Sequence, residues 1–405
     1  MKPSHPPHSL LPLTLSYAAM MALAISINLA PVLLTTLSRE FHGLTAEQLG
    51  RIGAVIFLGL VSAIAFTGPI VDRLPTHGPK LIAISGNLLI AAGLALLGIA
   101  TTYNAVLLAV FIMGFGAGTL DMVLSPIVAA LRPDRRTVAM NLLHSFYCFG
   151  AVVTILVGSL ALYANVPWRH TALLLIPLPA LVSLGFITVQ IPCLIPDGEQ
   201  RLRLRSLARQ KFFLLALIAI FLGGATEISM AYWLPTYAER ELHFPKLHSD
   251  FAFLAFCLAM GIGRIAIGIL GIRLRAIPLM LVCCILTTAL FLAGSFLPSP
   301  ALALAACILA GLTGSALWPS TLAVAADRFP TGGATMFGIL AAMGNFGGIV
   351  MPWLSGLIAD HSTLSLGLAT SAACPALMIP LLLLMGRMGT HPHAISNFPV
   401  AFDQY

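Results

Sequence analysis

Long apolar runs recur along nearly the whole chain, separated by short segments rich in glycine, proline and charge. A run of about 20 apolar residues is long enough for a helix to cross the hydrocarbon core of a bilayer. The pattern predicts twelve such helices, at residues 11–36, 46–72, 79–102, 105–131, 138–163, 167–191, 211–238, 250–273, 276–298, 300–326, 332–359 and 363–386. Backbone polar groups need internal partners in lipid, so each segment is expected to be helical.

The longest polar break, Pro192–Gln210, follows the sixth predicted helix. It divides the chain into an N-terminal six-helix bundle over 1–191 and a C-terminal one over 211–390, with a tail at 391–405. We therefore predict an all-α membrane protein of twelve transmembrane helices in two pseudo-symmetric bundles. Prolines stand at matching depths in the first, fourth, seventh and tenth helices, at Pro31, Pro126, Pro235 and Pro319. Paired halves with interrupted helices are typical of alternating-access transporters, so these four helices are expected to line a central path.

The composition supports a membrane location. Of the 405 residues, 59% are hydrophobic and 9% are charged, whereas soluble domains carry about 25% charged residues. The first apolar run is longer than the core of a signal peptide, which favours an uncleaved first helix. The seven cysteines fall mostly in apolar runs and show no metal-ligand spacing. They are interpreted as small buried side chains, and no disulfide, metal or organic cofactor is expected.

The lysines and arginines predict the orientation. Fifteen fall on the side that holds the N-terminus and the 192–210 linker, and Arg264 lies inside a helix. The opposite side holds five: Arg39, Arg51, Arg169, Arg240 and Lys246. Cytoplasmic loops carry the excess of such residues, so both termini are predicted to be cytoplasmic, in a multi-pass protein of the cell membrane, the inner membrane of a bacterium. The linker arginines are interpreted as facing lipid headgroups rather than nucleic acid.

Two acidic residues, Asp121 and Glu227, lie in the middle of apolar runs. A carboxylate at that depth costs about 2.5 kcal/mol or more if it faces lipid, so a cavity or a partner is expected beside each one. Burial favours the neutral form of a carboxyl group, and Asp121 is therefore a candidate proton carrier. The alternative is a structural carboxylate held by hydroxyl groups. Glu227, from the other bundle, is a candidate to titrate as a pair with Asp121, to bind sodium, or to bind a sugar hydroxyl.

Several segments carry a resemblance to a known family. Gly68 to Arg73, which ends the second helix, resembles the GxxxDR loop motif of the major facilitator superfamily. Six further segments resemble the branch of fucose–galactose–glucose:proton symporters: Leu120–Pro126, Met140–Gly150, Gly223–Glu239, Gly261–Gly268, Ala316–Ala323 and Gly344–Asp360. The resemblance covers both halves and implies the major facilitator fold and transport rather than catalysis.

The same resemblance implies roles for single residues. Asp121 lies five positions before Pro126, the spacing that the symporters keep between an acidic residue and a proline, so it is expected to bind a proton. Asn28 stands about where the fucose permease has an acid. Asp72, Arg73 and Arg264 match motif positions and are expected to act in gating, with Arg264 in an ion pair near the inner gate.

His144 shares a helix face with Asn141 and Cys148, three residues before it and four after it. It is a candidate to relay a proton or to donate to a hydroxyl, although a packing histidine fits equally well. The candidate solute-binding residues combine amides, a carboxylate and aromatic rings, a mixture that suits sugars. They are Asn28, Asn141, Tyr147, Thr226, Glu227, Trp233, Trp318 and Asn345. Each aromatic taken alone also fits simple packing.

These features predict a secondary transporter that carries a small neutral polyhydroxylated solute, such as a monosaccharide, together with a proton. Sodium is an alternative coupling ion. The expected partners are the solute and the bilayer, with no nucleic acid, and the protein is expected to be monomeric. Three alternatives remain open: a proton-coupled exporter of lipophilic compounds, a sodium-coupled or facilitative sugar carrier, and a non-transporting receptor. No nucleophile–base pair appears in the sequence, which argues against an enzyme.

Overall fold

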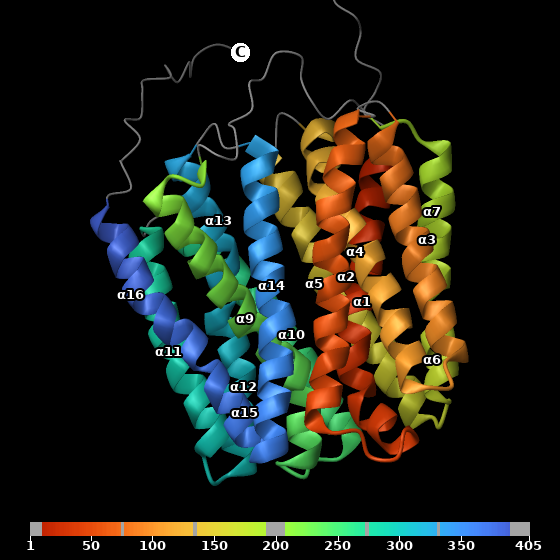
Figure 1. Cartoon of the computed structure of the whole chain (residues 1–405), viewed down its shortest axis with the longest axis vertical. Coiled ribbons are helices and arrows are strands. Elements are labelled where there is room, and N and C mark those ends of the chain that lie inside the picture. The colour runs from red at the N-terminus through yellow and green to blue at the C-terminus, as the bar shows by residue number, and fades with distance from the viewer. Residues whose placement is uncertain are drawn as a thin grey trace, which may run out of the picture.

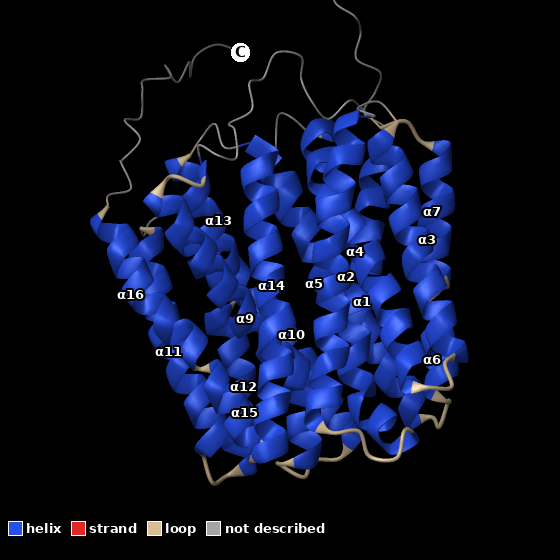
Figure 2. Cartoon of the chain, viewed as in Figure 1, coloured by secondary structure: helices blue, strands red, loops and turns tan. Residues whose placement is uncertain are grey.

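The computed structural model describes residues 10–73, 77–132, 136–191, 207–271, 275–329 and 333–388, and the regular elements in these ranges are all helices (Figure 2). The N half consists of α1 (Leu10–Glu40), α2 (Ala46–Arg73), α3 (Gly78–Ile99), α4 (Tyr103–Leu131), α5 (Arg136–Tyr163), α6 (Trp168–Leu173) and α7 (Pro177–Thr188). The C half consists of α9 (Lys211–Arg240), α10 (Lys246–Gly271), α11 (Ala276–Phe296), α12 (Pro300–Gly314), α13 (Leu317–Arg328), α14 (Gly333–His361), α15 (Leu364–Ser371) and α16 (Ala373–Arg387). Within the described ranges, twelve segments are long and apolar enough to span a membrane, which confirms the predicted twelve spans.

Three of the twelve spans are each built from two helices: α6 with α7, α12 with α13, and α15 with α16. In each case the chain leaves the regular helix just before a proline, namely Pro177, Pro319 or Pro375. Proline has no N–H to donate to the preceding turn, and its ring crowds the carbonyl of that turn. In the first turn of the second helix the missing donor costs little, since the first N–H groups lack helical partners there in any case.

The two halves stand side by side, with the N half in red to yellow and the C half in green to blue (Figure 1). We call the end where α7 stops and α9 starts the linker end, and the opposite end the far end; the linker end is at the top of Figure 1. The predicted linker residues 192–206 and the tail 391–405 lie outside the described residues. The boundaries of the two bundles therefore stay predictions.

A short repeat marks the related positions at which α1 and α9 end. The segments Arg39-Glu-Phe-His42 and Arg240-Glu-Leu-His243 differ in one residue, and both histidines have φ of 59°. A residue in this left-handed conformation commonly ends a helix and turns the chain back. Both halves thus use the same device at the far end, consistent with their pseudo-symmetry.

The buried apolar residues indicate where the halves meet. One hydrophobic cluster runs through the N half and continues into the C half at the far end, where it includes Met230, Trp233 and Phe253. A second cluster, with Phe212 and Met336, belongs to the linker-end part of the C half alone. Across the interface α2 packs against α14, α5 against α10, and α1 against α9. The shared core therefore lies toward the far end.

Candidate functional site

Glu227 on α9 and Arg264 on α10 form an ion pair inside the C half. Arg264 Nη2 donates to both carboxylate oxygens of Glu227, at 2.7 and 2.9 Å. The two side chains are 14% and 25% exposed, so the pair is reachable from an open space. Glu227 is thus the partner of the ion pair that the sequence predicts for Arg264. Its gating role stays a prediction.

Two N-half side chains lie opposite this pair. The Asn28 amide nitrogen on α1 donates to the Ala24 carbonyl at 2.8 Å and to the Tyr147 hydroxyl on α5 at 3.3 Å. The Tyr147 hydroxyl lies within electrostatic range of both Glu227 and Arg264. Because its oxygen accepts from Asn28, its own proton is free to be donated elsewhere. The interface therefore offers an amide, a phenol, a carboxylate and a guanidinium close together.

His144 lies one turn before Cys148 on α5 and is exposed. The side chains of Leu142, Phe149 and Val153 on the same helix are also exposed and form an apolar face for lipid. His144 is on the other side of the helix and within electrostatic range of Arg264, so its exposure marks a hollow between the halves. The structure thus brings His144 close to the ion pair; its role in proton transfer stays a prediction.

Asp121 has different surroundings. It lies half-buried on α4, and its hydrogen-bond partner is Asn345 on α14, across the interface. Among the described residues no cationic side chain faces the Asp121 carboxylate. The two intramembrane acids are therefore partnered separately, Glu227 by a cation and Asp121 by an amide, rather than by each other.

Other predicted solute residues lie inside the C half. Trp233 is 0% exposed, and its indole N–H donates to the Pro352 carbonyl at 3.0 Å. The Thr226 hydroxyl donates to the Leu222 carbonyl at 2.7 Å, within the same helix. This face of α9 packs within its own half, where Ser229 also hydrogen-bonds Ser355 and Ser371. The structure therefore buries both side chains, Trp233 in the core that the halves share at the far end, and exposes neither of them to a solute.

Trp318, on α13, is half-buried, and its ring packs against Gly224 on α9 and Gly344 on α14. A methyl group added to Gly224 or Gly344 would lie 2.7 or 2.4 Å from its ring. The side chains of Asn141, Asp72 and Arg73 lie outside the described part of the chain. Their predicted roles in solute binding and gating are not tested.

The sequence reasoning missed a charged network that joins the halves at the far end. Arg39 on α1 forms an ion pair with Glu239 on α9. Lys246 on α10 donates to the Val32 carbonyl of α1 at 2.7 Å and to Asp250 at 2.6 Å. The sequence does place Arg39 and Lys246 on the same side of the membrane, which is the feature that could have indicated this network.

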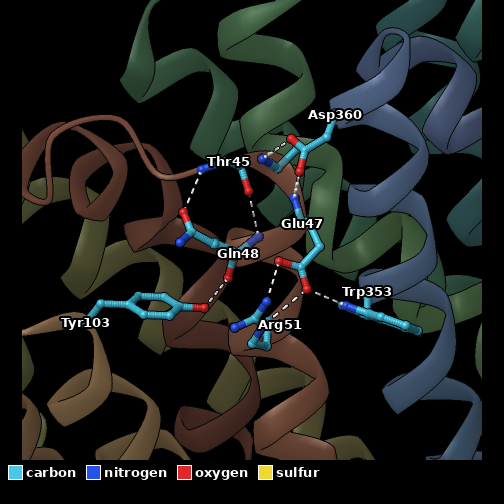
Figure 3. Close-up of polar contacts among 8 residues, drawn as sticks. Thr45, Glu47, Gln48, Arg51, Tyr103, Trp353 and Asp360 are labelled. Carbon is cyan, nitrogen blue, oxygen red and sulfur yellow. Dashed lines mark hydrogen bonds and ion pairs between the residues drawn. The ribbon is translucent and has the colours of Figure 1, made fainter.

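A second network holds α2 against α14, again at the far end (Figure 3). The Asp360 carboxylate accepts from the backbone N–H groups of Ala46 and Glu47 at 2.6 and 2.8 Å. The Glu47 carboxylate in turn accepts from the Trp353 indole and from Arg51, four residues along α2. Negative charge at a helix N-terminus is stabilising because the unpaired N–H groups point toward it.

These networks show which end is closed. Most of the hydrogen bonds between the halves over the described ranges involve far-end residues, and the exceptions are the Asp121–Asn345 contact and a hydrogen bond of Cys148 with Arg264. His144 is exposed nearer the linker end than these far-end contacts. The far end is therefore closed between the two halves.

Two halves of six spans each that meet around intramembrane acids, with one end closed, are typical of membrane transporters. The chain belongs to the major facilitator superfamily, whose family model matches residues 15–257 and 239–400. It is therefore a multi-pass membrane transporter and not an enzyme.

Relatives with different solutes are about equally similar. The chain is 26% identical to the L-fucose-proton symporter of Escherichia coli K12 over 56% of its own length and 59% of the symporter's. It is also 26% identical to the multidrug resistance protein MdtL of Vibrio parahaemolyticus, over 57% of this chain and 58% of that protein. The chain thus matches less than two thirds of the length of either protein. The putative niacin/nicotinamide transporter NiaP of Bacillus subtilis 168 is 26% identical over 90% of this chain and 92% of its own.

Solved structures agree on the fold. The crystal structure of the E. coli fucose:proton symporter has a TM-score of 0.67 at 22% identity, covering 93% of this chain and 98% of that one. The nucleoside transporter NupG has a TM-score of 0.76 at 16% identity, covering 94% and 100%. These findings confirm the all-α major facilitator fold and the resemblance to the fucose permease branch.

Proposed function

We propose that the protein imports a small neutral polyhydroxylated solute together with a proton, as a monomer in the bacterial inner membrane with both termini in the cytoplasm. The observation that carries this proposal is the different partnering of the two intramembrane acids. Arg264 neutralises Glu227, whereas the partner of Asp121 among the described residues is the neutral Asn345 amide. An unpaired acid inside a membrane is a poor structural element but a suitable proton carrier.

In the proposed cycle the solute and a proton enter from the far end when that end is open. Asp121 takes up the proton, which removes the charge that would otherwise have to move through a dry interface. Glu227, Tyr147 and Asn28 hold the solute hydroxyls while the halves rock to the state of this structure. The solute then leaves toward the linker end, and Asp121 releases its proton to the cytoplasm.

The relatives are transporters whose names give different solutes, so they do not identify the substrate of this chain. The L-fucose-proton symporter supports sugar and proton coupling, while MdtL is named as a multidrug resistance protein. The mixed donors and acceptors around Glu227 favour hydroxyl-bearing solutes over lipophilic ones, because unpaired polar groups would be left around a lipophilic compound.

The test is uptake by proteoliposomes that contain the purified full chain. Labelled L-fucose, D-galactose and D-glucose are supplied with an inward proton gradient, with an inward sodium gradient, or with neither. We expect accumulation of at least one sugar above equilibrium with the proton gradient alone. Accumulation with sodium alone would point to sodium coupling, and equilibration without accumulation would reduce the activity to facilitated diffusion. Proton-driven extrusion of a lipophilic dye without sugar uptake would replace the proposal with the exporter alternative.

A further inference from the structure

The Glu227–Arg264 pair places one negative and one positive group at the same point of the solute site. Arg264 binds Glu227 through Nη2 and also hydrogen-bonds Cys148 on α5, while its buried Nε has no hydrogen-bond partner. The side chains keep 14% and 25% exposure, so a solute in the interface can contact them. The pair therefore has unused hydrogen-bonding capacity of both kinds, acceptors on the carboxylate and donors on the guanidinium.

The pair carries no net charge, and this has consequences for the solute. A carboxylate solute must either displace Glu227 from Arg264, which leaves a buried carboxylate without its cation, or bind the remaining guanidinium N–H groups beside the like charge of Glu227, which repels it. An ammonium solute would compete with Arg264 for Glu227 in the same way. Removing one partner of a buried ion pair is strongly unfavourable because the other charge is left uncompensated. Neighbouring hydroxyls avoid this, since one donates to the carboxylate while the other accepts from the guanidinium.

We infer that Glu227 and Arg264 form a charge filter that admits solutes without net charge and binds a pair of adjacent hydroxyls. Arg264 is then a specificity-determining residue of the solute site. The inference rests on the proposed function, because it concerns the same site. Removal of the negative charge of Glu227 is expected to shift the preference of the site toward anionic solutes. Removal of the positive charge of Arg264 is expected to shift it toward cationic ones.

The experiment compares three sugars that share one ring and differ in charge: D-galactose, D-galacturonate and D-galactosamine. Their affinities for the detergent-purified full chain are measured by thermal stabilisation over a concentration series at pH 7. Wild type is expected to bind galactose most tightly. Glu227→Gln is expected to raise the affinity for galacturonate relative to galactose by about tenfold or more, and Arg264→Gln that for galactosamine by a similar factor.

Two further variants separate charge from fold. Glu227→Gln/Arg264→Gln removes both charges, so it is expected to weaken galactose binding without favouring either charged sugar. Glu227→Arg/Arg264→Glu keeps the pair with its members exchanged, and is expected to keep the wild-type order. These variants also serve if a single variant, with its unpaired charge, does not fold.

The outcomes keep the two proposals apart. Single variants that bind galactose but retain the wild-type ratios, or a double neutral variant that gains preference for one charged sugar, would overturn the charge filter and leave sugar transport standing. So would a wild-type protein that prefers a charged sugar. A wild-type protein that neither binds nor accumulates any neutral sugar would instead remove the proposed function.

Discussion

Asp121 is held by an amide from the opposite half, and this placement gives a direct prediction. Asparagine in its place keeps the size and the hydrogen-bonding shape but cannot carry a proton. Asp121→Asn is therefore expected to abolish proton-driven accumulation in proteoliposomes while counterflow of the unlabelled against the labelled sugar continues. Loss of both activities in a protein that is still folded would assign Asp121 a structural role.

Tyr147 gives a milder prediction. Its hydroxyl accepts from Asn28 and has a proton to donate near the Glu227–Arg264 pair. Tyr147→Phe removes one neutral hydrogen bond to the solute, worth about 0.5–1.5 kcal/mol, so sugar affinity is expected to fall roughly two- to tenfold. Sugar binding by thermal shift measures this change. Phe146→Leu on the same helix is a control that should leave affinity unchanged, because Phe146 stacks on Tyr17 rather than facing the ion pair. Equal losses in both variants would contradict a specific role for the hydroxyl.

Single residues were only partly predictable. Asp121, Glu227 and Arg264 could be found because a charge inside an apolar run is visible in the sequence. The pairing of Glu227 with Arg264 could be suspected but not assigned, since the two lie on different helices and either acid was an available partner. Trp233 shows the opposite case. Its helix face looked suited to a cavity, but that face is used for packing inside the C half, and sequence periodicity does not tell the two apart.

The helices α2 and α14 cross at the far end with backbone against backbone. A methyl group added to Gly356 would lie 2.3 Å from the Ala46 carbonyl oxygen, and one added to Gly50 would lie 2.4 Å from the Pro352 carbonyl oxygen. Backbone cannot move aside as a flexible side chain can. Gly356→Val is therefore expected to force the far end apart and to populate a state open on that side.

The separation is measurable with spin labels at positions 170 and 361, which are exposed at the far end in the N half and the C half. Gly356→Val should lengthen the distance between the labels relative to wild type. Gly386→Val is the matched control, because an added methyl group there meets the Ile277 side chain at an ordinary 3.6 Å within the same half. An unchanged distance in Gly356→Val would show that the crossing adapts without opening.

At the scale of elements, hydropathy predicted the number and approximate limits of the spans. It did not predict that three spans are divided, although the prolines responsible are plain in the sequence. A proline affects the turn before it and not the hydropathy of the segment, so an apolar run reads as one helix. The ends of α1 and α9 were predictable in principle, from the repeat at Arg39–His42 and Arg240–His243.

The uneven distribution of cations predicts the orientation of the whole molecule in the membrane. The far end carries Arg39, Arg51, Arg169, Arg240 and Lys246, while the larger group was assigned to the linker side. A green fluorescent protein fused after residue 405 is expected to fluoresce, since it matures in the cytoplasm, and alkaline phosphatase fused there should be inactive. An active phosphatase fusion would reverse the orientation.

The Pro192–Gln210 break predicts a division into two halves whose boundaries stay predictions, and nothing in the sequence predicts which end is closed. A transporter of this kind visits states open to either side, and a few kcal/mol separate them. The same sequence specifies both states, so only the contacts between the halves reveal which one is present. Here these contacts include those of Asp360 on α14 with the start of α2 and of Lys246 on α10 with Val32 on α1.

The start of α2 has two kinds of hydrogen bond, and they behave differently when the halves part. Thr45 and Gln48 bond each other's backbone N–H groups through their side chains, at 3.2 and 3.0 Å, so this part travels with the helix. The amides of Ala46 and Glu47 depend on Asp360 from the other half. Each opening of the far end therefore exposes the N–H groups of Ala46 and Glu47 to water, while the Thr45–Gln48 bonds keep the start of α2 helical. The rate of deuterium uptake at these two amides should report how often the far end opens, and Gly356→Val should accelerate uptake at Ala46 and Glu47 but not at Gln48.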